Sequence, residues 1–407
     1  MKRANPFSTT LSAALAATLT AFAGAAGAAI SGDVVKIGVM TDLSGVYLDY
    51  AGKGSVEAAK MAIEDFGNGL PGKKIELVTA DHQNKADIGS AKAREWIDRD
   101  GVDAIVDLPN SSVALAVSRI ASEKKRISLI TGGANLRHTN EECSPYIVHY
   151  VYDTYALANV AGKAMVKQGL KSWYFLTADY AFGASLETAT ADVVKASGGS
   201  VVGQIKHPLN ASDFSSFVLQ AQSSKAQVVA LANGGGDTIN AIKAANDFGL
   251  PKNQTLVGLL MTISDVHSLG LKLTQGMKMT DAWYWDLNPQ TREFGSRFFA
   301  RMKRMPNMVH AGTYSAVLQY LKAVQAAGSD DSDTVMAALK KAKLNDAFAK
   351  NGYIRADGRM MHDMYLMEVK KPADSKSPWD YLKLVATVPA EEAFQPLSQS
   401  RCPLVKK

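Results

Sequence analysis

The chain has 407 residues, of which 21% are charged and 47% hydrophobic, and its formal net charge at pH 7 is +6. This length is enough for two domains of ordinary size, each with its own core. Lysine and arginine form no long run, so the sequence does not indicate a nucleic-acid partner. After the N-terminal segment, no stretch reaches the ~18 apolar residues that a membrane-spanning helix needs.

The N-terminus has the layout of a secretory signal peptide. Lys2 and Arg3 precede the uncharged stretch 11–23, and small residues follow up to Ala28. A basic start, a short apolar region and a small-residue cleavage site are typical of such peptides. We therefore predict a signal peptide over residues 1–28. No cysteine lies at the cleavage site, so a lipid anchor there is not expected.

Cys143 and Cys402 are the two cysteines of the chain. In an exported protein, a single pair of cysteines favours a disulfide, and we predict one between them. The alternative is two unpaired buried thiols. Their spacing does not match a metal site, and we expect no bound metal.

The first half of the chain alternates short apolar runs with amphipathic stretches. Strands are predicted at residues 34–40, 74–80, 104–108 and 127–130, and helices at 55–66, 86–97 and 113–124. This alternation indicates a parallel sheet covered by helices on both faces.

A less regular passage, 137–152, could be a crossing between two domains, because a second α/β series follows it. There we predict strands at 173–177, 201–205, 227–231 and 255–258, and helices at 154–168, 182–196, 214–223 and 238–248. The last part of the chain should complete these two units rather than form a third. Its predicted elements are strand-like residues 277–280, helices 291–302, 311–327 and 332–341, and strands 365–369 and 382–388.

Two turns at strand ends are candidates for holding an anion. Asn110, Ser111 and Ser112 follow the strand 104–108 and precede a helix, so their polar groups gather at the positive end of that helix. The alternative is that Asn110 and Ser111 only cap the helix. Gly133, Ala134 and the neighbouring Asn135 follow the next strand, where glycine lets the backbone approach a ligand. In an open parallel sheet both turns face one crevice.

Other predicted strand ends carry aromatic, polar and sulfur-containing side chains that could surround a partly apolar ligand. The alternative for each ring is core or hinge packing. The candidates are Tyr47, Tyr50, Tyr180, Phe182, Asn233, Asp237, Met261 and the cluster Trp283-Tyr284-Trp285.

Catalytic motifs are missing from the sequence. There is no Gly-x-Ser-x-Gly elbow, no phosphate-binding loop and no His-Glu-x-x-His pair. The glycine run 234–236 lacks the spacing of a dinucleotide-binding turn. We therefore expect neither enzymatic activity nor a cofactor, and turnover of a bound ligand would contradict this.

Several segments together resemble a known family: 35–45, 102–107 with 110–112, 133–134, 178–183 and 213–217. The chain is similar to periplasmic solute-binding proteins of ABC importers, in the family that binds branched-chain amino acids, over essentially its whole mature length. The resemblance implies an α/β fold of two Rossmann-like lobes with parallel sheets, joined by three crossings. It also implies a monomeric periplasmic protein, hinge closure on a ligand carboxylate held by the two turns, and a permease partner in the inner membrane.

On this interpretation residues 29–151 and about 285–365 form the N-terminal lobe. Residues 152–284 and about 366–390 form the C-terminal lobe, and 391–407 are a tail. The predicted ligand-binding residues are Tyr47, Tyr50, Asn110, Ser111, Ser112, Gly133, Ala134, Asn135, Tyr180, Asn233, Met261 and Trp283.

One departure from the family bears on the ligand. Amino-acid binders carry an acidic residue after the strand corresponding to 255–258, where it pairs with the ligand ammonium, but this chain has Leu259-Leu-Met261. A buried ammonium without a partner is costly. We therefore favour a carboxylate without an α-amino group, benzoate-like or phenylpropenoid. The alternatives are a branched-chain or other amino acid, with Asp237 or Asp265 as the acid, and a sensor that reports its ligand to a membrane receptor.

Overall fold

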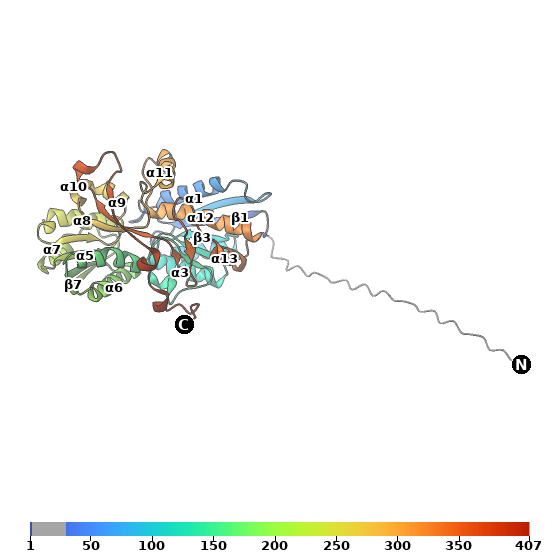
Figure 1. The fold of residues 1–407 in the computed structure, drawn as a ribbon, viewed down its shortest axis with the longest axis horizontal. Coiled ribbons are helices and arrows are strands. Elements are labelled where there is room, and N and C mark those ends of the chain that lie inside the picture. Colours follow the sequence, from blue (N-terminus) through green and yellow to red (C-terminus); the bar gives the residue numbers. More distant parts are fainter. Residues whose placement is uncertain (2–29, 407) are drawn as a thin grey trace.

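Two α/β units lie side by side in the computed structural model (Figure 1), and a smaller antiparallel sheet shares core residues with the second of them. The structure describes Met1 and residues 30–406. Except for Met1, the predicted signal peptide lies outside the described residues. We call the first unit the N-terminal lobe and the second the C-terminal lobe. Their boundaries near 285, 365 and 390 stay predictions.

The N-terminal lobe is built on a five-stranded parallel sheet in the order β2-β1-β3-β4-β5. Its central strands are apolar runs that are buried throughout, as a sheet covered on both faces requires. The strands are β1 (Val34–Thr41), β2 (Lys74–Asp81), β3 (Ala104–Asp107), β4 (Ile127–Ile130) and β5 (Ile147–His149), and the helices between them are α1 (Gly52–Phe66), α2 (Ala86–Asp98) and α3 (Ser111–Glu123).

The C-terminal lobe has a four-stranded parallel sheet in the order β7-β6-β8-β9. Its strands are β6 (Ser172–Ala178), β7 (Ser200–His207), β8 (Val228–Ala232) and β9 (Thr255–Gly258). Its helices are α4 (Thr154–Leu157), α5 (Lys163–Lys167), α6 (Ala181–Ala196), α7 (Ser215–Ser223), α8 (Gly236–Asp247), α9 (Ile263–Leu269) and α10 (Leu271–Thr274).

Three crossings join the lobes, and two of them flank the antiparallel sheet β10-β13-β14. With the predicted lobe boundaries, the chain enters the C-terminal lobe before α4, returns after β10 and leaves the N-terminal lobe again before β13. The elements involved are β10 (Lys278–Asp281), α11 (Pro289–Met302), α12 (Met308–Ala327), α13 (Ser332–Lys341), β11 (Tyr353–Ile354), β12 (Met360–Met361), β13 (Met364–Val369) and β14 (Leu382–Val388).

Helix α12 explains why the late helices belong to the N-terminal lobe. Most of its side chains are buried, and it packs against α1. The two helices meet where Gly54 faces His310, and a Cβ on Gly54 would lie 2.3 Å from Nε2 of that histidine. The glycine therefore allows the close approach. None of the described helices is both long and apolar enough to span a membrane.

The predicted elements of both lobes are present, with bounds that agree within three residues. The helix predicted at 154–168 contains a π-helical turn, Ala158–Gly162, between α4 and α5. Strand β5 lies inside the passage that we interpreted as a crossing, because three residues give no periodic pattern. The pairs α9–α10 and β11–β12 were also not predicted.

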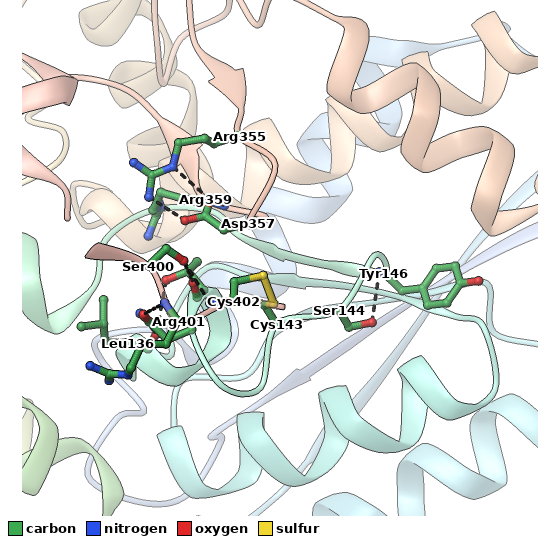
Figure 2. Close-up of a disulfide and its surroundings, with 12 residues drawn as sticks. Leu136, Cys143, Ser144, Tyr146, Arg355, Asp357, Arg359, Ser400, Arg401 and Cys402 are labelled. Atoms are coloured by element: carbon green, nitrogen blue, oxygen red, sulfur yellow. Dashed lines mark hydrogen bonds and ion pairs between the residues drawn. A yellow bond between two sulfur atoms is a disulfide. The ribbon is translucent and has the colours of Figure 1, made fainter. Parts of the chain in front are cut away.

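The predicted disulfide is confirmed. Cys143, between the 3₁₀ turn η1 (Leu136–Thr139) and β5, is bonded to Cys402, and their Cα atoms are 5.6 Å apart. Figure 2 shows the bond with Ser400 and Arg401 of the C-terminal segment beside it.

A buried ion pair lies where the chain first crosses between the lobes. The guanidinium of Arg359 is within 3.4 Å of the carboxylate of Asp153, and both side chains are about 1% exposed. Asp153 also caps α4, since its Oδ1 accepts a hydrogen bond of 2.8 Å from the N–H of Ala156. Burial raises the pKa of Asp153, and the charge of Arg359 opposes that shift.

Replacing Asp153 with asparagine should destabilise the protein by ~3–5 kcal/mol, because it leaves a buried guanidinium without its counter-charge. Asparagine can still cap α4, so the loss reports the charge pair. The matched control is Glu141→Gln, which breaks the exposed pair between Glu141 and Arg401 and should cost less than ~1 kcal/mol. Urea unfolding of both variants measures the difference, and equal losses would contradict the assignment.

Candidate functional site

The loop after β1 is fixed by one buried carboxylate. Oδ1 of Asp42 accepts a hydrogen bond of 2.7 Å from the N–H of Gly45, and its Oδ2 accepts one of 2.9 Å from the N–H of Tyr47. The side-chain amide of Asn84 also donates to Oδ2 of Asp42, at 2.7 Å. The loop has no strand partner, so these bonds satisfy its backbone N–H groups and hold Tyr47 at the edge of the sheet.

Four tyrosines meet between the lobes: Tyr47, Tyr50, Tyr152 and Tyr180, which we call the tyrosine cluster. The hydroxyl of Tyr47, from the N-terminal lobe, is hydrogen-bonded to that of Tyr180, from the C-terminal lobe. The hydroxyl of Tyr50 donates to that of Tyr152, which donates to the carbonyl of Gly132 at 2.6 Å. Burial raises the pKa of all four phenols, so each hydroxyl keeps its proton at neutral pH.

Further contacts across the cleft show that the lobes are closed on each other. The carbonyl of Val46 accepts a hydrogen bond of 2.9 Å from the N–H of Gly236. The amide of Asn135 donates to the carbonyl of Ala181 at 2.7 Å. Gly235 has a φ of 58°, and a Cβ on it would lie 2.3 Å from the Val46 carbonyl oxygen. The glycine run, which matched no dinucleotide-binding turn, thus lets the two backbones touch.

The first predicted anion turn is at the N-terminus of α3. Oδ1 of Asn110 accepts hydrogen bonds from the N–H groups of Ser112 and Val113, at 3.0 and 3.1 Å. Asn110 is therefore a helix cap, as the alternative interpretation held. Ser111 is 1% exposed, and its hydroxyl has no hydrogen-bond partner among the described residues. Its hydroxyl remains available to a ligand at the positive end of the helix.

The backbone that leads into this turn is strained. Asp107 and Leu108 have φ values of 87° and 59°, in the left-handed region that residues with a Cβ rarely adopt. Such outliers persist only where the surroundings impose them, and they cluster at functional sites. Asp107 is buried, it accepts a hydrogen bond of 3.2 Å from the Thr131 hydroxyl, and burial raises its pKa to about 6.

The second predicted turn has its carbonyl groups occupied. Gly133 accepts a hydrogen bond of 2.8 Å from Nε2 of His149, and Ala134 accepts one of 2.9 Å from the N–H of Thr154. Within the described part of the chain, the N–H groups of Gly133 and Ala134 donate no hydrogen bond. The turn therefore offers two backbone donors next to the tyrosine cluster, whose Tyr152 bonds the preceding carbonyl.

Three predicted ligand residues are engaged in packing. The amide of Asn233 donates to His207 at 3.0 Å and accepts from the hydroxyl of Thr238 at 2.7 Å. Met261 is buried in the core of the C-terminal lobe. Nε1 of Trp283 donates to the carbonyl of Ala347 at 2.7 Å. For Trp283 this is the packing role that we gave as the alternative for each ring.

Tyr152, Asp107 and His149 were missed as site residues. Tyr152 and His149 lie in the passage 137–152, where β5 is too short to give a strand pattern. Asp107 was interpreted as the last part of a buried strand. The signal that could have found Tyr152 is its place directly before α4, at a crossing between the lobes.

The two candidates for an ammonium partner differ in how they are bonded. Asp265 caps α9 through the N–H and hydroxyl of Thr262, at 2.7 and 3.1 Å. Asp237 is 1% exposed; its Oδ2 accepts a bond of 3.1 Å from the N–H of Asn210, and its Oδ1 has no partner among the described residues. Burial raises the pKa of Asp237 to about 6. Its charge also contributes to the raised pKa of Tyr47 and Tyr180, so it lies near the cluster.

A family model described as periplasmic binding protein matches residues 34–376, which is most of the chain. The chain belongs to this family. Membership implies a periplasmic location and a small-molecule ligand that is passed to a membrane permease. The fold agrees, since the solved relatives are type I periplasmic binding proteins.

Three solved structures show how far the similarity extends. A periplasmic binding protein from Burkholderia mallei is 60% identical, with 92% of this chain and 100% of that chain covered and a TM-score of 0.90. A branched chain amino acid ABC transporter periplasmic ligand-binding protein from Burkholderia xenovorans is 44% identical, with 91% and 99% covered and a TM-score of 0.81. A Rhodopseudomonas palustris solute binding protein in complex with 3,4-dihydroxybenzoic acid is 24% identical, with 88% and 98% covered and a TM-score of 0.80, a likeness of fold alone.

The raised pKa of Asp237 predicts a pH-dependent cost to stability. Between about pH 4 and pH 6 the folded chain holds a proton on Asp237 that the unfolded chain has lost, so stability falls as the pH rises through this window. Asp237→Asn should remove the fall. The variant should be more stable than the parent above pH 6, by up to ~3 kcal/mol, and similar to it near pH 4.

Urea unfolding across this pH range checks the prediction. The control is Asp213→Asn, because Asp213 is exposed and hydrogen bonds from Ser215 lower its pKa. That variant should not gain stability above pH 6. If the free energy of unfolding changed with pH in the same way for Asp237→Asn and the parent chain, Asp237 would not be the cause of the fall in stability.

Proposed function

We propose that this substrate-binding protein of an ABC importer captures a small aromatic carboxylate between its two lobes. The observation that supports this most is the tyrosine cluster at the closing interface. It provides rings from both lobes and neutral hydroxyl groups that can bond a ligand. Aromatic rings beside a few placed polar groups suit a flat, partly apolar molecule.

The carboxylate would lie between the two turns. The Ser111 hydroxyl and the N–H groups of Gly133 and Ala134 are donors without competing partners inside the described protein, and the N-terminus of α3 adds its positive dipole. Backbone N–H groups and a helix N-terminus bind an anion without a lysine or arginine. Each hydrogen bond to a charged group is worth ~1.5–3 kcal/mol.

The other end of the site supports a ligand without an ammonium group. The segment after β9, where the amino-acid binders carry an acid, is Leu259-Leu-Met261, and its three side chains are buried and apolar. An ammonium there would lose its hydration without gaining a partner. The phenol groups of the cluster can instead pair with ring substituents such as a hydroxyl.

An amino acid is the second candidate, and Asp237 is the reason. One of its carboxylate oxygens has no partner among the described residues, and the residue lies near Tyr47 and Tyr180. The Burkholderia xenovorans relative is named as a branched chain amino acid ABC transporter protein, which supports this candidate.

Transport follows from the difference in affinity between the open and closed forms. A ligand that contacts both lobes binds the closed form better and shifts the population toward it. The permease then distinguishes loaded from empty protein by shape. Delivery to a membrane receptor would use the same shift, and neighbouring genes would separate the two roles.

A thermal-shift screen of the mature protein tests the ligand class. Benzoate, 4-hydroxybenzoate and cinnamate should raise the melting temperature, because a ligand that binds only the folded state stabilises it by RT ln(1 + [L]/Kd). Leucine and valine should not. If leucine or valine stabilises the protein and Asp237→Asn abolishes that effect, the amino-acid candidate replaces the aromatic one.

Ser111→Ala should weaken binding of the stabilising carboxylate about tenfold or more, from the loss of one bond to a charged group. The matched control is Ser118→Ala on the same helix, whose hydroxyl is buried and donates to the carbonyl of Leu115 at 3.4 Å. Calorimetric titration should show unchanged affinity for the control. Unchanged affinity for Ser111→Ala would remove this residue from the site.

A further inference from the structure

The C-terminal segment from Ala390 to Cys402, which we call the strap, runs from the end of β14 across the hinge side of the molecule. It contains the short helix α14 (Ala390–Ala393) and the 3₁₀ turn η5 (Leu397–Gln399). The family match ends at residue 376, before the strap begins. Its contacts involve both lobes and the crossings between them.

The far end of the strap is fixed to the N-terminal lobe. The disulfide joins Cys402 to Cys143, and hydrogen bonds surround it (Figure 2). The Ser400 hydroxyl donates to the carbonyl of Thr139 at 3.1 Å, and the N–H of Arg401 donates to the amide oxygen of Asn140 at 2.8 Å. This anchor is covalent.

The middle of the strap packs against the crossings. The ring of Phe394 is 1% exposed and lies between two buried groups. The guanidinium carbon of Arg359 is 4.4 Å from its centroid, and the imidazole of His362 is 5.2 Å away, edge to face. Arg359 pairs with Asp153 at the first crossing, and His362 bonds the carbonyl of Val151 there at 2.5 Å. Phe394 therefore contacts the groups that hold the hinge together.

The near end of the strap contacts the C-terminal lobe. The amide of Asn159, in the π-helical turn after α4, donates to the carbonyl of Glu392 at 2.5 Å. Beyond it, Gln395, Gln399 and Arg401 share a groove of about 800 Å³ with helix α6 and the turn η1. The strap thus contacts both lobes, and a groove lies beside it.

We propose that the strap is a fourth connection between the lobes, closed covalently by the disulfide, and that it biases the protein toward the closed form. Its contacts with Asn159, Arg359 and the segment 139–143 are all made while the cleft is closed. Hinge opening changes the distance between the C-terminal lobe, which the near end of the strap contacts, and the disulfide on the N-terminal lobe. A strap without the disulfide would therefore favour the closed form less than the bonded one. The open population in the absence of ligand then depends on the disulfide, and so does the affinity for any ligand that binds the closed form.

Hydrogen exchange of the ligand-free mature protein tests this without knowledge of the ligand. The N–H of Gly236 bonds the carbonyl of Val46 across the cleft, so its exchange reports opening. In the double variant Cys143→Ser/Cys402→Ser, we expect this segment to exchange several-fold faster, while short-time exchange in β3 and β8 stays low. Small-angle scattering should show a larger radius of gyration. Because the chain has two cysteines, a reductant added to the folded parent has a single target and provides the same test if the variant folds poorly.

A second variant keeps the disulfide. Phe394→Leu removes the ring against Arg359 and should give a smaller shift in the same direction. Its matched control is Phe298→Leu, a buried ring in the N-terminal lobe that stacks on His310 at 5.2 Å, away from the strap. The control should leave the exchange of Gly236 unchanged relative to the core strands. Unchanged exchange at Gly236 and an unchanged radius of gyration in the reduced protein would overturn the proposal, whichever ligand the screen identifies.

Discussion

The architecture depends on a constraint that acts in both lobes: the carboxyl ends of parallel strands lie at one edge of their sheet. In the N-terminal lobe this places the loop of Tyr47, the turn of Ser111 and the turn of Gly133 together, although they are far apart in the sequence. In the C-terminal lobe it places Tyr180 and the glycines 234–236 at the opposing edge. The crossings turn these edges toward each other, so closure brings together backbone and hydroxyl groups from these loops.

The electrostatics of the cleft follow from burial. Phenols whose pKa is raised stay protonated, and they bond one another and the Gly132 carbonyl without carrying charge. The carboxyl groups of Asp107 and Asp237 are buried at the facing edges of the two lobes, and each has an oxygen without a partner among the described residues. A site of neutral donors with two buried carboxylates can discriminate ligands by hydrogen bonds and shape.

A second group of buried charges lies at the hinge. Arg359, in the segment before β13, is fully buried between Asp153 and the ring of Phe394. Its guanidinium therefore contacts both the first crossing and the strap. Such a group is costly to desolvate and costly to leave unpaired, which favours one arrangement of the crossings over others. The disulfide adds a constraint of another kind, because it limits where the strap can go whatever the state of the cleft.

The sequence by itself determined the two α/β series, the pairing of Cys143 with Cys402 and the use of the strand ends, because these follow from periodicity, from a single cysteine pair in an exported chain and from parallel topology. It also indicated that Asn110 could cap the helix, and the structure shows that cap. The tertiary structure alone decided that Tyr152 joins the cluster, that Asn233 is satisfied by His207 and Thr238, and that Trp283 packs at Ala347. The physical reason is that a side chain's partners come from elements distant in sequence, and a hydrogen-bonding group looks the same in a sequence whether the fold satisfies it or leaves it free.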